Sequence, residues 1–142
     1  MTTAPLELAD RFERLELDPG SFRHRDHVAA AYAMLRKYPF LEALSRYAST
    51  IRTMATNAGA ATKFHVTITV AFMALIAERM ESSPHRDFDD FSREHPDLFA
   101  SDILERFYPP DQLQSELARK IFVMPDMESS YAGELPRAKP SR

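Results

Sequence analysis

Apolar residues recur every three or four positions along much of the chain, which predicts a series of amphipathic helices. The stripe is clearest in residues 24–38 and 40–58, and a shorter one covers residues 6–15. Asp18-Pro19-Gly20 has the chemistry of a turn and ends the first helix. Gly59 follows the third stripe, where a glycine commonly terminates a helix.

Residues 63–81 carry two conflicting patterns. The first half, from Phe64 to Val70, alternates strictly between apolar and polar and is rich in β-branched residues, which favours a strand. The second half, Ala71 to Met80, is composed of strong helix formers. No partner strand of similar quality exists elsewhere, and an isolated strand cannot satisfy its own hydrogen bonds. We therefore expect a single, largely buried helix.

The C-terminal half has weaker patterns. Residues 87–99 predict a short helix, and Asp102 with Glu105 resembles a capping box ahead of a further turn. Pro109-Pro110 is expected to open a last helix whose stripe is Leu113, Leu117 and Ile121. The predicted fold is all-α, an irregular bundle of about five to six helices over residues 1–124. An extended, proline-containing tail follows over residues 125–142 and either packs on the body through Met127 and Tyr131 or stays free.

Composition places the chain among folded single domains. Of its 142 residues 44% are apolar and 27% charged, with a net charge of −3. The absence of cysteine excludes disulfides, thiolate metal sites and thiol nucleophiles. Mild acidity argues against nucleic-acid binding. No apolar run reaches the roughly 20 residues of a membrane span, and residues 1–10 lack a basic signal-peptide region. We expect a cytoplasmic protein that does not enter a membrane.

Several common catalytic motifs are missing from the sequence. Three scattered glycines cannot form a GxGxxG or Walker phosphate loop. The sequence has no HExxH zinc-peptidase helix, no ExxH di-iron pattern, no GxSxG elbow and no EF-hand loop. Each of these chemistries needs its residues at fixed positions, so all are excluded.

Three histidines form the remaining candidate site. His24 and His27 are three residues apart, which places them side by side on a helix, and His65 opens the apolar segment further along. Together they could hold a divalent metal such as zinc or iron and leave coordination positions open. Thr69, one turn beyond His65, could position a bound water or ligand, and Asp26 could orient the ligands.

Less specialised roles explain the same histidines equally well. His24 could cap its helix, His27 could form a hydrogen bond in the first turn, and His65 could be a satisfied residue at a helix start. A third reading is acid–base catalysis without metal. His85 and His95 lie in polar surroundings and are expected to be exposed and without function.

Other polar residues are weaker candidates for this site. Tyr32, Glu42 and Tyr47 could enter the same cavity. Arg23 and Arg25 could bind a carboxylate or phosphate, although a solvated helix entrance accounts for them more simply.

The paired motifs Phe22-x-His24-x-x-His27-Val28 and Phe64-His65-x-Thr67-x-Thr69 resemble a family of small bacterial all-helical proteins of uncharacterised function. The similarity covers roughly residues 10 to 125. It implies that His24, His27, His65 and Thr69 act as one site, and it implies no substrate. Phe64 stands where that family is expected to have tyrosine, so no hydroxyl is available there.

Two functional hypotheses follow. The first is a metal-binding protein or small metal-dependent enzyme with His24, His27 and His65 as ligands. The alternative is a non-catalytic helical module that binds a small molecule or a protein partner, including a second copy of itself.

Overall fold

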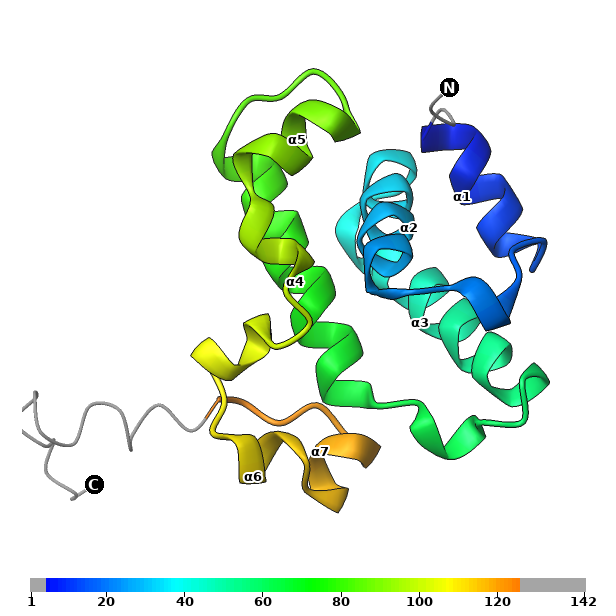
Figure 1. Cartoon of the computed structure of the whole chain (residues 1–142), viewed down its shortest axis with the longest axis vertical. Coiled ribbons are helices and arrows are strands. Elements are labelled where there is room, and N and C mark those ends of the chain that lie inside the picture. Colours follow the sequence, from blue (N-terminus) through cyan, green and yellow to red (C-terminus); the bar gives the residue numbers. More distant parts are fainter. Residues whose placement is uncertain (1–4, 126–142) are drawn as a thin grey trace, which may run out of the picture.

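The computed structural model describes residues 5–125, and within them all regular secondary structure is helical (Figure 1). The predicted all-α class is confirmed. The α-helices are α1 (Pro5–Glu13), α2 (His24–Lys37), α3 (Phe40–Asn57), α4 (Val66–Ser82), α5 (Phe88–Glu94), α6 (Pro110–Leu113) and α7 (Glu116–Lys120). Short 3-10 helices lie between them: η1 (Pro19–Ser21), η2 (Ala61–Lys63), η3 (Pro96–Phe99) and η4 (Ile103–Arg106). Of the tail predicted at residues 125–142, only Pro125 lies within the described part.

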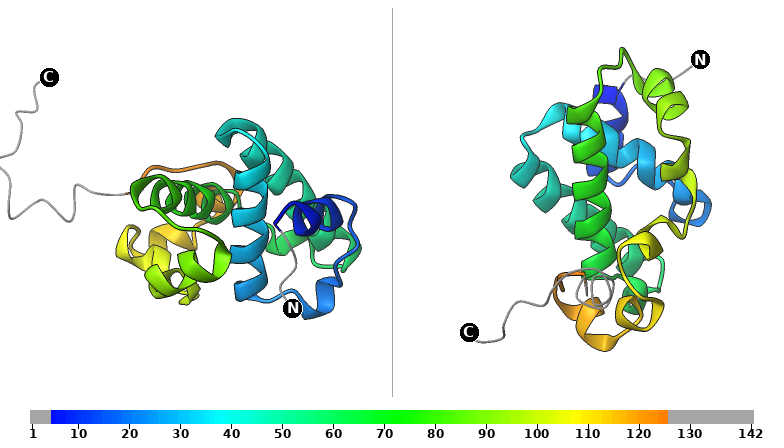
Figure 2. Two further views of the ribbon diagram at one scale, coloured as in Figure 1. Left: turned by 90° about the horizontal axis from the view of Figure 1, so that it is seen from above. Right: turned by 90° about the vertical axis from the view of Figure 1, so that its left-hand side faces the viewer.

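The helices form two groups on either side of α4. Helices α1, α2 and α3 pack on one another, and α4 packs against both α2 and α3. The C-terminal segments line the opposite side of α4, with η4 and α7 in direct contact with it. Figures 1 and 2 show α4 running along the molecule between these groups. Because α2, α3 and α4 meet, their side chains can enclose a common space.

Helix α3 ends at the glycine that the sequence singled out. Gly59 has a φ of 72°, in the left-handed region that glycine enters without strain. Its N–H donates to Thr56 O at 3.0 Å, and the next amide, of Ala60, donates to Ala55 O at 2.8 Å. These two bonds define a Schellman motif, so the chain turns sharply here toward α4.

The segment with conflicting patterns is a helix. Helix α4 covers Val66–Ser82, which confirms the predicted single helix, starting three residues later than expected. Two polar residues of the alternating half are buried because backbone groups satisfy them. The Thr67 hydroxyl donates to Ile121 O at 2.7 Å and accepts from Val123 N at 3.1 Å, and the Thr69 hydroxyl donates to His65 O at 2.7 Å. Their alternation therefore reflects burial on a helix.

The C-terminal predictions are only partly right. Residues 87–99 divide into α5 and η3, because Pro96 has no N–H with which to continue the first helix. The capping box at Asp102 is wrong, since its side chain forms no cap bond and only the 3-10 turn η4 follows.

The single last helix is also wrong. Residues 110–120 form two short helices, and Ser115 caps the second by accepting from Ala118 N at 3.1 Å. Leu117 and Ile121 are 59% and 50% exposed, so they do not belong to a buried stripe.

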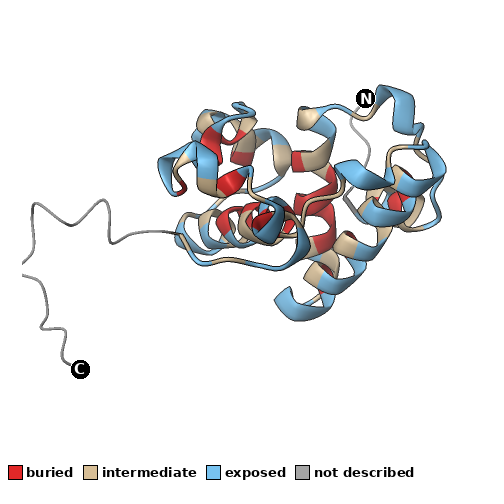
Figure 3. Cartoon of the chain, turned by 90° about the horizontal axis from the view of Figure 1, so that it is seen from below, coloured by how far each residue is buried: buried red, intermediate tan, exposed pale blue. Residues whose placement is uncertain are grey.

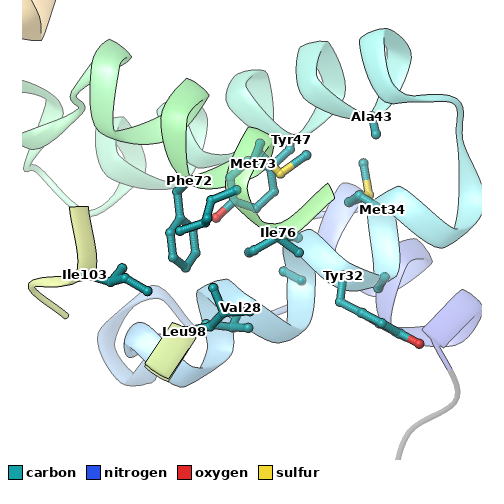
Figure 4. Packing of buried hydrophobic residues seen from close by; sticks show 14 of the residues in the cluster. Val28, Tyr32, Met34, Ala43, Tyr47, Phe72, Met73, Ile76, Leu98 and Ile103 are labelled. Atoms are coloured by element: carbon teal, nitrogen blue, oxygen red, sulfur yellow. The ribbon is translucent and has the colours of Figure 1, made fainter. Parts of the chain in front are cut away.

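The core is built mainly from α2 and α4. A run of α2 from Ala30 to Met34 is fully buried, and Met73 and Ile76 face it from α4. Figure 3 shows the buried residues gathered where these helices meet, and Figure 4 shows Phe72, Ile103 and Leu98 near Val28 at one end of this cluster. That end of the core adjoins the cavity described next.

No helix within residues 5–125 is long and apolar enough to cross a membrane.

Candidate functional site

A partly open cavity of about 520 Å³ lies between α2, α3 and α4, and residues in or near η1, η2 and η4 also line it. Most of its wall is apolar, including Phe22, Ile51, Met54, Phe64, Ile68, Phe72, Ile103 and Leu104. Polar side chains in the wall are His24, His27, Tyr47, Lys63, His65, Thr69 and Ser101. The structure thus brings all four predicted site residues, His24, His27, His65 and Thr69, to one cavity.

His65 is held at both ring nitrogens. Its Nδ1 accepts from the backbone N–H of Ile68 at 3.1 Å and so caps α4. Its Nε2 therefore carries the hydrogen and donates to the carbonyl oxygen of Leu113 at 2.7 Å. The His65 ring is therefore neutral, and both of its nitrogens have hydrogen-bond partners. His65 matches the hypothesis of a satisfied residue at a helix start.

His24 is held at one nitrogen. Its Nε2 lies 2.9 Å from the carbonyl oxygen of Leu98 and donates to it, since a carbonyl can only accept. The ring also lies 5.2 Å from that of Phe72, centroid to centroid. Nδ1 has no hydrogen-bond partner among residues 5–125. His24 therefore joins α2 to the C-terminal half while keeping one nitrogen open.

His27 is paired with a buried tyrosine. Its Nδ1 lies 3.2 Å from the hydroxyl of Tyr47, which is only 3% exposed. That hydroxyl has no other partner within the described chain. Imidazole nitrogen is the better acceptor, so the hydroxyl donates to Nδ1 and the hydrogen of the neutral ring resides on Nε2.

The His27 environment also disfavours its charged form. Burial, reinforced by repulsion from His24, lowers its pKa from 6.5 to about 4, against a smaller opposite effect of Asp26. Burial likewise raises the pKa of Tyr47. At neutral pH the pair is uncharged, with His27 Nε2–H as a hydrogen-bond donor.

The Nε2 of His27 remains available to a ligand. It has no partner within residues 5–125. It is not sealed in the core either, because the one buried side-chain nitrogen or oxygen without a partner in that range is Nε2 of His85.

Residues 5–125 do not assemble a metal site by themselves. Among the residues described, no group of three or more histidine or carboxylate side chains could hold a metal ion. Both nitrogens of His65 already have partners in the chain, and two hydrogen bonds would have to break before it could complete a set with His24 and His27.

Of the additional polar candidates, only Tyr47 lines the cavity. Tyr32 packs instead against Phe88 and Phe91. Glu42 pairs with Arg46 on the surface of α3.

The residues beside the α2 histidines also lie outside the wall. Asp26 accepts from the backbone N–H of Arg23 at 2.8 Å, so it caps α2 and does not orient the histidines. Arg25 stacks on the ring of Phe99.

His85 and His95 are half-buried, so the expectation that they are exposed is wrong. Nδ1 of His85 donates to Ser83 O at 3.2 Å, while its ring packs against Phe91. His95 lies between Arg79 and the Ser83 hydroxyl, at 3.1 and 3.0 Å. Burial and the Arg79 charge lower its pKa. Neither histidine lines the cavity.

Lys63 and Ser101 were not anticipated as site residues. Lys63 lies in the η2 turn two residues before His65, and Ser101 lies beside η4. Neither residue belongs to an apolar stripe of a predicted helix, so the sequence pattern does not place them at the cavity. Proximity of Lys63 to the second histidine motif was the one available clue.

Comparisons with family models, with curated proteins and with solved structures find no significant match to this chain.

Proposed function

We propose that this chain is a small-molecule-binding protein whose ligand occupies the cavity between α2, α3 and α4. The observation that carries the proposal is the cavity itself. Its volume of about 520 Å³ falls within the roughly 300–1,000 Å³ of ligand pockets, and a mainly apolar wall with a few polar groups is typical of them. Binding of a small molecule was the alternative that the sequence left open beside a metal centre.

The state of the polar groups supports binding more than metal or acid–base chemistry. His65 is occupied at both nitrogens, which leaves a metal only His24 and His27 from the predicted set. A histidine with a pKa of about 4 is a weak general base at neutral pH. As a neutral N–H donor in an apolar wall, however, His27 can orient a ligand through one hydrogen bond.

The proposal can be tested with three probes of the same shape: 3-phenylpropionate, 3-phenylpropanamide and 3-phenylpropylamine. Each is titrated at millimolar concentration into the full chain while backbone amide chemical shifts are followed by NMR. We expect at least one probe to shift the amides of the cavity residues in a saturable manner. A cavity-filling variant, Ala55→Leu, should abolish these shifts because Ala55 lines the cavity.

The matched control is Ala74→Leu, which adds the same side chain at an exposed position of α4 outside the cavity wall. It should bind the probe as the parent does. If none of the three probes binds, or if both variants bind equally well, the cavity is not a ligand site. Elemental analysis of tag-free protein completes the test: near-stoichiometric metal, lost in both His27→Ala and His65→Ala, would replace this proposal with the metal hypothesis.

A further inference from the structure

We propose that the ligand is a small carboxylic acid with an apolar body, bound as the carboxylate, which accepts the Nε2–H hydrogen bond of His27 and is balanced by the charge of Lys63. This inference rests on the proposed function and specifies its ligand class. Three features of the cavity support it: the direction of its open hydrogen bond, the sign of its charges and the nature of its walls.

The first feature is a donor fixed in the wall. Because the Tyr47 hydroxyl donates to Nδ1, the hydrogen of the His27 ring is on Nε2. This N–H is a donor that a ligand carrying a hydrogen-bond acceptor can pair with. An alkylamine is protonated at neutral pH, and its ammonium group brings only donors, so it could bond to the open Nδ1 of His24 but could not accept from this N–H. Hydrogen bonds to an ionised acceptor are roughly twice as strong as neutral ones, so a carboxylate uses the donor best.

The second feature is the sign of charge around the cavity. Among residues 5–125, no aspartate or glutamate lines the cavity, whereas Lys63 does. Lys63 forms no ion pair with any residue that the structure describes, so its charge is not already neutralised. A second cation, Arg52, lies over the ring of the lining residue Phe64, 5.7 Å from its centroid. The local field therefore favours an anion.

Two of the acids next to lining residues, Asp18 and Asp26, are committed elsewhere, whereas Asp102 and Glu105, next to Ser101 and Leu104, are exposed and lie outside the wall. Asp18, beside the lining residue Pro19, accepts from Gly20 N at 3.0 Å, and Asp26 accepts from Arg23 N. The N-terminal ends of α2 and α4, at His24 and His65, both adjoin the cavity. Their partial positive charges add to the field of Lys63 in the same sense.

The third feature is the apolar wall, which defines the body of the ligand. Ile51 and Met54 contribute aliphatic and thioether surface from α3, and Phe64 and Phe72 contribute aromatic faces. Such a wall accepts a phenyl ring or a short alkyl chain and gains from its desolvation. A highly hydrated anion such as phosphate would find too few donors here.

The probes described above discriminate the ligand class because they differ only in the head group. We expect 3-phenylpropionate to bind about tenfold or more tightly than the amide, as expected for charge-assisted over neutral hydrogen bonding, and the amine to bind weakest. Lys63→Met should weaken binding of the acid severalfold and leave the amide unchanged. Lys120→Met, which removes an exposed cation outside the wall, is the matched control and should affect neither.

His27→Asn removes the Nε2–H donor while keeping a polar group that can accept from Tyr47. It should weaken both the acid and the amide, and a two-dimensional amide spectrum of the parent type confirms that the variant is folded. The inference is overturned if the amide or amine binds as tightly as the acid, or if Lys63→Met leaves the acid's affinity unchanged. Those outcomes leave the binding function intact, whereas failure of all three probes to bind removes the binding function itself.

Discussion

Protonation of His27 should destabilise the fold between about pH 6.5 and pH 4. The ring is buried beside Tyr47, and its pKa falls from 6.5 to about 4 in the folded chain. When the protein unfolds, His27 regains its ordinary pKa and takes up a proton more readily. The unfolded state is therefore favoured as the pH falls through this interval.

The magnitude follows from the two pKa values. Each pH unit between them is worth about 1.4 kcal/mol, so the interval from 6.5 to about 4 corresponds to roughly 3 kcal/mol. The folded-state pKa is the lower one, which fixes the sign. The stabilisation is fully present above about pH 6.5 and is lost progressively as the pH falls toward 4. Residual access of water to the ring makes this figure an upper bound.

The assay is urea unfolding of the parent and of His27→Asn at several pH values between about 7.5 and 4, with EDTA present throughout. Subtracting the two curves removes the contributions of carboxylates, which both proteins share. The free energy of unfolding of the parent should fall relative to the variant by as much as 3 kcal/mol over this range. A difference that does not change with pH, or an NMR titration of His27 with a pKa near 6.5, would refute the reasoning.

Three further predictions concern the scaffold, and urea unfolding measures each. Thr67→Val should cost about 1–3 kcal/mol, because it removes both hydrogen bonds between the buried Thr67 hydroxyl and backbone groups of the segment after α7, whereas Thr67→Ser should keep most of the stability; equal losses in both would contradict the hydrogen-bond account. Gly59→Ala should cost about 1 kcal/mol from its φ of 72° alone, since a Cβ there meets no atom within 4 Å; an unchanged midpoint would show that the turn relaxes. Asp97→Asn should cost about 1 kcal/mol at neutral pH, because Asp97 accepts from Arg79 at 2.8 and 3.0 Å and this pairing keeps its pKa well below the ordinary range. That stabilisation is present above about pH 4 and is lost as the pH falls further, so parent and variant should converge in acid.

The sequence predicted best those helices whose packing produces a regular spacing of apolar residues. Helices α2 and α3 match their expected bounds to within one residue, because one face of each helix is buried and the opposite face is exposed to solvent. Near the C-terminal end the same spacing gave a wrong prediction. Leu117 and Ile121 are spaced as on one face of a helix, but both side chains are exposed. Short helices such as α6 and α7 are held by caps and tertiary contacts. They have too few turns for a repeating apolar pattern to be recognised in the sequence.

The sequence predicted four residues that line the cavity, but it could not predict their hydrogen-bond partners. Spacing places His24 beside His27, while the approach of His65 depends on how α4 packs against α2. The acceptors that hold two of these rings are the carbonyl oxygens of Leu98 and Leu113, which lie 74 and 48 residues away from their donors in the chain. Backbone carbonyls have no sequence signature, so no pattern could show that His65 is already satisfied.

That distinction between satisfied and open nitrogens decides what the cavity can recognise. A ring held at both nitrogens, like His65, contributes shape and fixes the start of α4. A ring held at one nitrogen by a hydroxyl that donates to it, like His27, carries its hydrogen on the other nitrogen and offers that N–H to a ligand. Tyr47 therefore acts on the ligand without touching it. Tyr47→Phe should allow both tautomers of His27, so that His27 could offer a ligand an acceptor as well as a donor.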